Sequence, residues 1–288
     1  LYEEISNSIN EHLWDEYSGM YVDRFWDGRI SSRLAASNFY PLVAGVASKE
    51  RSERILKTLL DENKFWGEHV LPTISRDDPA FSDQQYWRGT IWPPTNYLVY
   101  QGLKRYRFDE AAALLARRSV DLFLGSWRRF QLCRENYDSR TGAGGGQKYQ
   151  SWGPLFALMG IEEFVDVTPW EGLRIGNLFP PDESELSTIR VRDHLWEVKL
   201  SERGIHVSID GKRSIESSAP ILLREVELDE GGIRGKISAS KANDFTVSLG
   251  TDEVVVTVDG VRNSTTARTV HVPEGEHTFS IALLSDLT

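Results

Sequence analysis

Residues 109–130 have the sequence DEAAALLARRSVDLFLGSWRRF, and this stretch decides what kind of fold the first half of the chain can form. Its apolar side chains recur three or four positions apart, as they do along one face of an α-helix. Phe108 and Asp109 come just before the stripe and supply a capping residue. The pattern predicts one long helix with an apolar face made of Ala113, Ala116, Val120, Phe123, Leu124 and Trp127.

Shorter stretches of the first half show the same helical spacing. Ile5, Ile9 and Leu13 lie four residues apart, and Pro93-Pro94 suits a helix start because the first turn has spare N–H groups. Short links join helices into hairpins, whereas the long connections are crowded with Trp, Tyr, Gly and charge. We expect helices near 2–14, 38–48, 50–62, 93–106, 109–130 and 152–166, and long connections at 15–37, 63–92 and 131–151.

The second half alternates polar and apolar residues, which is typical of β-strands. Asp210-Gly211 and Asp259-Gly260 are turn signals between such runs. Residues 171–288 contain only four aromatic residues (Trp196, Phe179, Phe245 and Phe279). We therefore predict a helical domain at 1–170 and an antiparallel β-sandwich of about eight strands at 171–288, with strands at 188–192, 196–200, 205–209, 245–249, 254–258 and 279–283.

Helical hairpins with long, function-bearing loops at one end suggest an α/α toroid. A closed toroid usually has six hairpins, and about three are expected here. Residues 91–103 look apolar on more than one face, and a half ring would leave such surface in water. We expect a second polypeptide, or an N-terminal stretch, to complete the ring. A compact helical bundle that closes on itself is an equally good reading of the periodicity.

The overall composition excludes several classes of partner. The net charge is −10, from 33 Lys and Arg against 43 Asp and Glu, which argues against a nucleic-acid surface. No apolar run approaches the ~18 residues that a membrane span needs, and no signal-peptide pattern opens the sequence. Cys133 is the one cysteine, so the chain has no intrachain disulfide. We expect a cytoplasmic protein without nucleic-acid or membrane partners.

Trp and Tyr gather beside carboxylates and Arg in the long loops, which is the composition of a saccharide site. Aromatic rings stack on the apolar faces of pyranoses, and charged groups bind the hydroxyls. A single Trp is more often core filler, but Trp87, Arg88 and Trp92 occur together in one loop and favour a site.

Glu135 is the strongest candidate for a catalytic carboxylate. It follows a long apolar helix and precedes a glycine run that lets the backbone fold over a ligand. An exposed glutamate at the entrance to a loop is the plainer reading. Hydrolysis of a glycoside needs two carboxyl groups flanking the bond. The candidate partners, none of which the spacing singles out, are Asp23, Asp77, Asp78 and Asp83.

Other chemistries lack the necessary residues. Only His12 and His69 precede residue 171, so we expect no metal site and no cofactor. Cys133 has no nearby His to activate it, and the glycine run lacks the ending of a phosphate loop.

Residues 86–98, YWRGTIWPPTNYL, resemble the Tyr-Trp-Arg-Gly-x-x-Trp signature of glycoside hydrolase family 63. That family includes processing α-glucosidases and mannosylglycerate hydrolases, and it is akin to trehalases. Residues 135–142 and 151–155 resemble its later motif, and 40–42 and 71–73 also fit. The resemblance covers roughly residues 1–168.

This resemblance implies an (α/α)6 barrel and an inverting mechanism, in which a general acid protonates the leaving oxygen and a general base activates water. Glu135 matches the family's base. An α-linked glucoside or mannoside is the implied substrate. The residues that match the sugar pocket are Tyr86, Trp87, Arg88, Gly89, Trp92, Asn136, Tyr137 and Trp152.

One departure from the family pattern concerns the general acid. No Trp-Asp-x-Gly-Met-Asp-like segment exists in the sequence, and Trp14-Asp15 and Trp26-Asp27 are superficial matches. We therefore expect the C-terminal portion of such an enzyme, inactive alone and completed by an N-terminal half or companion chain. The alternatives are a non-catalytic carbohydrate-binding or assembly subunit and an α/α-toroid polysaccharide lyase.

Overall fold

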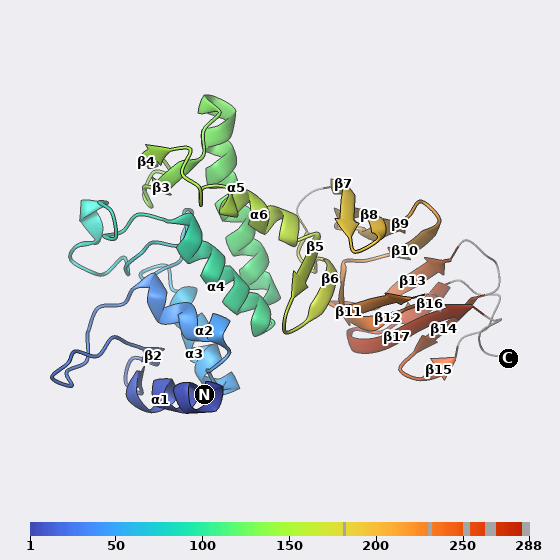
Figure 1. The fold of residues 1–288 in the computed structure, drawn as a ribbon, viewed down its shortest axis with the longest axis horizontal. Coiled ribbons are helices and arrows are strands. Elements are labelled where there is room, and N and C mark those ends of the chain that lie inside the picture. Colours follow the sequence, from blue (N-terminus) through green and yellow to red (C-terminus); the bar gives the residue numbers. More distant parts are fainter. Residues whose placement is uncertain (181–182, 230–231, 250–253, 263–268, 284–288) are drawn as a thin grey trace. The chain divides into compact units, whose positions relative to one another are not determined.

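A computed structural model describes residues 1–180, 183–229, 232–249, 254–262 and 269–283 (Figure 1). The chain forms two compact units, Leu1–Gly160 and Ile161–Thr288, which we call the helical unit and the β unit. This boundary lies before the one at 170/171 that the aromatic composition predicts. The reason is that strands β5 (Val165–Thr168) and β6 (Gly172–Gly176) extend a sheet of the β unit.

All six predicted helices occur in the described residues. The predicted helix at 38–48 is shorter than expected, because a 3₁₀ turn at Ala36–Phe39 precedes it and Gly45 ends it with a φ of 70°. The α-helices are α1 (Tyr2–His12), α2 (Tyr40–Ala44), α3 (Lys49–Leu59), α4 (Pro93–Arg105), α5 (Asp109–Phe130) and α6 (Leu155–Glu162).

Helix α5 has the predicted bounds, and its buried face matches the predicted one in part. Asp109 is its first residue, and Phe108 occupies the N-cap position without a side-chain cap. Trp127, expected on the apolar face, is 39% exposed and stacks on Phe123 with ring centroids 5.9 Å apart. Ala113 and Ala116 of the predicted face are buried, and the other buried residues of the helix include Ala112, Leu115, Ser119, Leu122 and Ser126. Part of the apolar stripe therefore remains on the surface of this chain.

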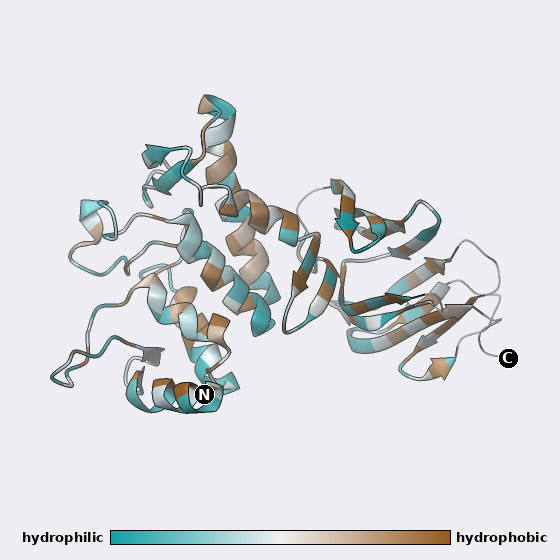
Figure 2. Ribbon diagram, in the orientation of Figure 1, coloured by the Kyte–Doolittle hydropathy of each residue, from teal (hydrophilic) through white to brown (hydrophobic). Residues whose placement is uncertain are grey.

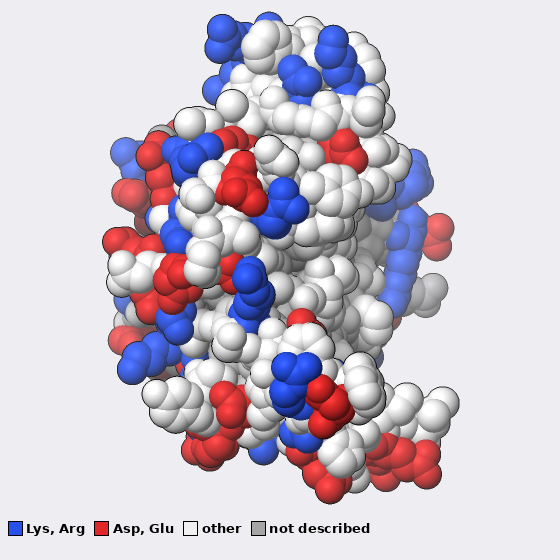
Figure 3. Space-filling view, turned by 90° about the vertical axis from the view of Figure 1, so that its left-hand side faces the viewer, with Lys and Arg blue, Asp and Glu red and all other residues white. Residues whose placement is uncertain are grey.

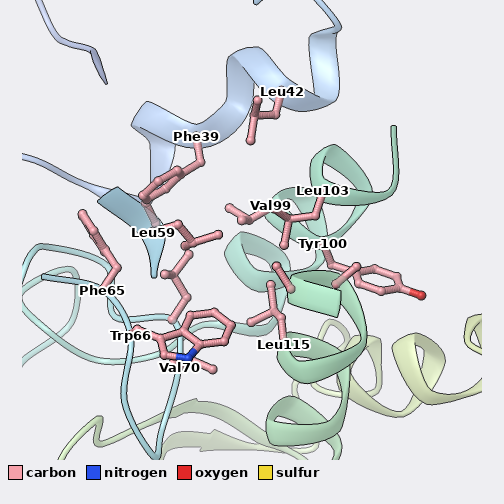
Figure 4. Close-up of a cluster of buried hydrophobic side chains, with 14 of the residues drawn as sticks. Phe39, Leu42, Leu59, Phe65, Trp66, Val70, Val99, Tyr100, Leu103 and Leu115 are labelled. Atoms are coloured by element: carbon pink, nitrogen blue, oxygen red, sulfur yellow. The ribbon is translucent and has the colours of Figure 1, made fainter. Parts of the chain in front are cut away.

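The core of the helical unit lies between α2, α3, α4 and α5 (Figure 4). Phe39 and Phe65 of this core meet edge to face, with ring centroids 4.9 Å apart. Gly102 of α4 lets α2 approach closely, since a Cβ there would lie 2.8 Å from Leu42 Cβ. Figure 2 shows hydrophobic residues recurring along α4 and α5, in keeping with this packing.

The three long connections lie side by side at one end of the helical unit (Figure 1). Isolated β-bridges join Ala35 to Ile74, Pro72 to Ile91, and Ile91 to Tyr137. Tyr137 also pairs with Gly144 in the hairpin of β3 (Arg134–Tyr137) and β4 (Gly144–Lys148). The connections after α1, α3 and α5 are thus linked in series, and we call this arrangement the loop ladder. A short hairpin, β1 (Trp14–Asp15) with β2 (Met20–Tyr21), begins the first connection.

The β unit contains two antiparallel sheets. The six-stranded sheet has the order β16-β13-β10-β9-β8-β7, and the seven-stranded sheet has the order β15-β14-β17-β12-β11-β6-β5. Apolar residues of both sheets, Val207 and Ile237 among them, share one buried cluster. The remaining strands are β7 (Ser184–Val191), β8 (His194–Ser201), β9 (Gly204–Ile209), β10 (Arg213–Ser217), β11 (Ile221–Asp229), β12 (Gly232–Ala239), β13 (Asn243–Ser248), β14 (Val254–Val258), β15 (Val261–Arg262), β16 (Thr269–Val272) and β17 (Gly275–Leu283).

Every run predicted as a strand falls on or overlaps one of these strands, although the sheets contain more strands than the eight expected. The two predicted Asp-Gly turns are confirmed as hairpin turns. Asp210 and Gly211 have φ values of 55° and 64°, and Asp259 and Gly260 have values of 48° and 76°. Val258 pairs with Val261, so Asp259 and Gly260 form a two-residue hairpin loop, which requires positive φ at both residues for native twist. Ile209 pairs with Arg213, so Asp210 and Gly211 belong to a three-residue loop.

Candidate active site

Three tryptophans from two connections form an aromatic cluster. Trp87 stacks on Trp92 with ring centroids 4.2 Å apart and planes 18° apart. Trp152, from the connection before α6, lies 6.0 Å from Trp92. Trp92 is 2% exposed and Trp87 is 46% exposed. In this cluster Trp92 is therefore buried, and the indole ring of Trp87 on top of it faces solvent.

The conformation of the loop before α4 keeps the Trp87 side chain partly exposed. Trp92, on which Trp87 stacks, donates hydrogen bonds from Nε1 to Thr90 Oγ1 at 2.7 Å and to the Tyr86 carbonyl at 3.1 Å. Tyr86 has a φ of 52° and sets its ring edge-on to both Trp87 and Trp92. Gly89 has a φ of 100°, and a Cβ there would lie 2.6 Å from the Phe81 carbonyl. Glycine is thus required at this turn by both conformation and space.

Arg88 lies on the same turn and is paired within its own loop. Its Nε donates to Asp83 Oδ2 at 2.8 Å, and both side chains are about half exposed. The guanidinium also donates to Gln85 Oε1 at 3.3 Å. A ligand at this position would meet an arginine whose position is already fixed.

Glu135 lies on β3, where its carboxylate folds over the β3–β4 hairpin. Its Oε2 accepts a hydrogen bond from the Gln147 backbone N–H at 2.7 Å. Its backbone carbonyl accepts one from Trp152 Nε1 at 3.1 Å. Gly146 makes room for the side chain, since a Cβ there would lie 2.4 Å from Glu135 Oε2. Trp152 therefore ties the strand of Glu135 to the aromatic cluster.

The two residues after Glu135 are more buried than a ligand-contacting role suggests. Asn136 is 9% exposed and pairs with Gly145 across the hairpin. Tyr137 is 0% exposed and packs on Phe156 with ring centroids 5.5 Å apart. Burial raises the pKa of Tyr137 to about 12. In this chain Tyr137 contributes to the core beneath the loop ladder.

Three of the candidate partner carboxylates have hydrogen-bond partners other than Glu135. Asp78 is buried and accepts two hydrogen bonds from Arg33, at 2.9 and 3.1 Å. Asp77 accepts a hydrogen bond from Ser75 Oγ at 2.5 Å. Asp83 pairs with Arg88, as described above, and Asp23 lies at the base of the hairpin 23–31, where its carbonyl accepts from Ser31 N–H. Among the described residues, none of these carboxylates shares a hydrogen bond with Glu135.

Asp77 and Asp78 instead line a cavity of about 640 Å³ in the helical unit, which we call the Arg33 cavity. It is formed by the connections after α1 and α3 and includes neither Glu135 nor the aromatic cluster. Sequence reasoning missed Arg33 and Lys64, which also line it. No sequence signal indicated them, because the connections that they come from meet only in the fold. Figure 3 shows this end of the helical unit, where acidic and basic side chains are interspersed.

Sequence reasoning also missed a contact that fixes the aromatic loop. Gln84 Oε1 accepts hydrogen bonds from Ser139 N–H at 2.9 Å and Ser139 Oγ at 3.1 Å. It joins the loop of Trp87 to the hairpin of Glu135. Nothing in the local sequence at Gln84 indicates this role, because its partner is 55 residues away.

The described residues contain no group of three or more His, Cys, Asp or Glu placed to hold a metal ion. No helix within them has both the length and the apolar character needed to cross a membrane.

Comparison with known proteins relates this geometry to a family. Residues 2–153 match the family described as "Mannosylglycerate hydrolase MGH1-like glycoside hydrolase domain". A mannosylglycerate hydrolase from Thermus thermophilus is 36% identical over 155 residues, covering 51% of this chain and 34% of the relative. A periplasmic trehalase from Pseudomonas aeruginosa is 31% identical over 150 residues, covering 51% of this chain and 26% of the relative.

Among solved structures, a glycoside hydrolase family 63 mannosylglycerate hydrolase from Thermus thermophilus in complex with glucose matches 52% of this chain and 37% of its own. The identity is 29% and the TM-score is 0.46. In sequence, this chain matches about a third of the length of the curated mannosylglycerate hydrolases. The matched residues, 2–153, make up more than half of the chain and contain both the aromatic cluster and Glu135. The chain therefore belongs to the mannosylglycerate hydrolase MGH1-like glycoside hydrolase family.

Proposed function

We propose that this chain is part of an inverting α-glycosidase that hydrolyses an α-glucoside or α-mannoside, with Glu135 as the general base. The observation that carries the proposal is the attachment of Glu135 to the aromatic cluster through Trp152, which donates to its carbonyl. Matched relatives named mannosylglycerate hydrolase and trehalase support the substrate class.

Only one of the two carboxylate oxygens of Glu135, the proposed base, accepts a hydrogen bond from the described residues. Gln147 N–H binds Glu135 Oε2, and among the described residues Oε1 makes no hydrogen bond. In this mechanism the base takes a proton from water as the water oxygen attacks the anomeric carbon. The bond to the leaving oxygen breaks as a general acid on the opposite face protonates it, and the anomeric configuration inverts.

The sugar would stack on Trp87, whose outer ring remains exposed, and its hydroxyls would meet Arg88. Gly89 keeps the backbone close to the ligand, and Asn136, Tyr137 and Trp152 shape the floor. In this assignment Trp92 and Tyr86 act mainly by fixing Trp87.

The general acid in this proposal comes from outside residues 1–288, since the sequence contains no match to the family's acid segment. The helical unit would form part of an (α/α)6 toroid with an N-terminal half or companion chain, and the β unit would be an appended β-sandwich. The exposed part of the α5 stripe supports a packing partner for the helical unit.

The decisive experiment mixes the purified chain with a candidate N-terminal polypeptide and assays α-glucosides and α-mannosides. Activity only in the mixture, with an inverted anomer detected by proton NMR, supports the proposal. In the active mixture, Glu135→Gln should lower kcat by about 10³-fold or more, because water activation is lost. The matched control is Glu53→Gln, an exposed glutamate of α3, which should leave kcat unchanged.

Sugar binding without turnover in any mixture would contradict the enzyme assignment and support a carbohydrate-binding subunit. Near-normal turnover of Glu135→Gln would reject this residue as the base. Products that absorb in the near ultraviolet would point to a lyase instead.

A further inference from the structure

The Arg33 cavity is a built site that the proposed hydrolysis does not use. Its two walls are held together by the bridge between Ala35 and Ile74 and by the hydrogen bond from Ser75 N–H to the Leu34 carbonyl. The side chain of Asp78 is 4% exposed and is fixed by Arg33 and by the Ala80 N–H at 2.8 Å. The cavity is therefore organised before any ligand arrives.

The charges of the cavity disfavour an anionic ligand. Arg33 and Asp78 neutralise each other, which leaves Lys64 against Asp15 and Asp77. Hydrogen bonds from the side chain and backbone of Ser18 hold the pKa of Asp15 below its ordinary value, so its negative charge persists. A carboxylate or phosphate ligand would meet this net negative lining.

The remaining groups suit a polyhydroxylated molecule. Carboxylates accept hydrogen bonds from hydroxyls, the Lys64 ammonium donates them, and serine hydroxyls do both. The serines that line the cavity are Ser18, Ser31, Ser32 and Ser75.

The rim adds an apolar contact surface. Tyr17 is 99% exposed and Ile30 is 45% exposed, and both line the opening. An exposed ring beside a polar cavity matches a pyranose, which has an apolar face and a hydroxylated edge. Tyrosine supplies a large rigid surface of this kind.

We propose that the Arg33 cavity is a second saccharide-binding site for a neutral mono- or disaccharide, separate in all its lining residues from Glu135 and the aromatic cluster. Asp77 and Lys64 bind hydroxyls, and Tyr17 stacks on the ring. This binding does not require Glu135 to act as a base.

The test is isothermal titration calorimetry of the full chain carrying Trp87→Ala, which weakens the aromatic cluster as a competing sugar site. The probes are methyl α-D-mannopyranoside, methyl α-D-glucopyranoside and trehalose. We expect at least one probe to bind, and Asp77→Asn or Tyr17→Ala to weaken it about tenfold, since removing one charged hydrogen bond or one stacked ring costs on the order of 1.4 kcal/mol. Lys64→Met should do the same.

Matched controls lie on α3, outside the cavity. Glu53→Gln and Lys57→Met change exposed side chains of the same types and should leave the affinity unchanged. Far-ultraviolet circular dichroism checks that each variant folds. The proposal is overturned if no probe binds, if the cavity variants bind as tightly as the controls, or if binding to the wild-type chain disappears with Trp87→Ala. None of these outcomes depends on whether Glu135 catalyses hydrolysis.

Discussion

At the scale of single residues, Gly89 determines the shape of the aromatic turn. Gly89→Ala would place a methyl group 2.6 Å from the Phe81 carbonyl at a φ of 100°. We expect a loss of about 2–3 kcal/mol in the unfolding free energy of the helical unit. All tryptophans except Trp170 and Trp196 lie in that unit, so Trp fluorescence in a urea titration reports it.

Gly28 provides the matched control for this substitution. It has a φ of 86°, and a Cβ there meets nothing within 4 Å. Gly28→Ala should therefore cost only the conformational strain, about 1 kcal/mol. Equal losses in the two variants would show that the contact with Phe81 is unimportant.

The buried phenol of Tyr137 makes stability depend on pH in the alkaline range. Its pKa is raised to about 12 by burial, so the folded chain keeps the phenol neutral where the unfolded chain ionises it. The stabilisation is complete below the unfolded pKa near 10 and is lost as pH rises from about 10 to 12. Tyr137→Phe should lose less stability than the wild type over this range, measured by urea titrations at several pH values.

Burial also raises the pKa of Tyr106 to about 12, so the variant should keep part of the wild-type pH dependence. An unchanged pH profile in Tyr137→Phe would contradict the assignment of this ionisation to Tyr137.

At the scale of elements, the β3–β4 hairpin fixes the direction of the Glu135 carboxylate. Gly146→Ala would place a methyl group 2.4 Å from Glu135 Oε2 and displace it. With Glu135 as the proposed base, we expect kcat of the mixed enzyme to fall about 10²-fold, since a displacement near 1 Å can misalign a catalytic group by that factor. The measurement is kcat at saturating substrate.

The same hairpin offers a control with a similar backbone. Gly142 has a φ of 68°, close to the 64° of Gly146, but its Cβ would meet His69 at 2.8 Å. Gly142→Ala carries the same strain and should retain more activity than Gly146→Ala. A similar loss of kcat in both would attribute the effect to the hairpin fold rather than to Glu135.

Replacing glycine by alanine should have opposite effects on the unfolding free energy at Gly102, where α4 contacts α2, and at Gly125 of α5, which has no such contact. Gly102→Ala would place a methyl group 2.8 Å from Leu42 Cβ and 2.9 Å from Val43 N, so we expect a loss of about 1–2 kcal/mol from overpacking. Gly125→Ala in α5 meets nothing within 4 Å and should gain up to about 1 kcal/mol from helix propensity. Trp fluorescence in urea titrations measures both, and a gain at Gly102 would contradict the close packing.

At the scale of the whole molecule, local sequence patterns predict the helices and strands. Tertiary contacts determine which faces are buried and where the two units divide. The bounds of α5 follow from its periodicity, but its buried face depends on what packs against it, so Trp127 lies outside the core. The strands of the β unit alternate clearly, whereas β5 precedes the compositional boundary because it pairs with β6.

The sequence indicates those parts of the candidate site whose residues are close together in the chain. Trp87 and Trp92 stack because one turn joins them. Arg33 and Asp78 are 45 residues apart, and only the fold brings them together. For this reason the sequence indicated the aromatic cluster and left the Arg33 cavity unnoticed.

The loop ladder has a practical consequence for protein engineering. Because Ala35, Ile74, Pro72, Ile91 and Tyr137 are bridged in series, a graft that replaces one connection also removes the register of its neighbours. Specificity would have to be transplanted as a set of three loops. Insertions belong at the tips beyond the bridges, such as the turn at 26–28, where added residues leave the shared backbone pairing intact.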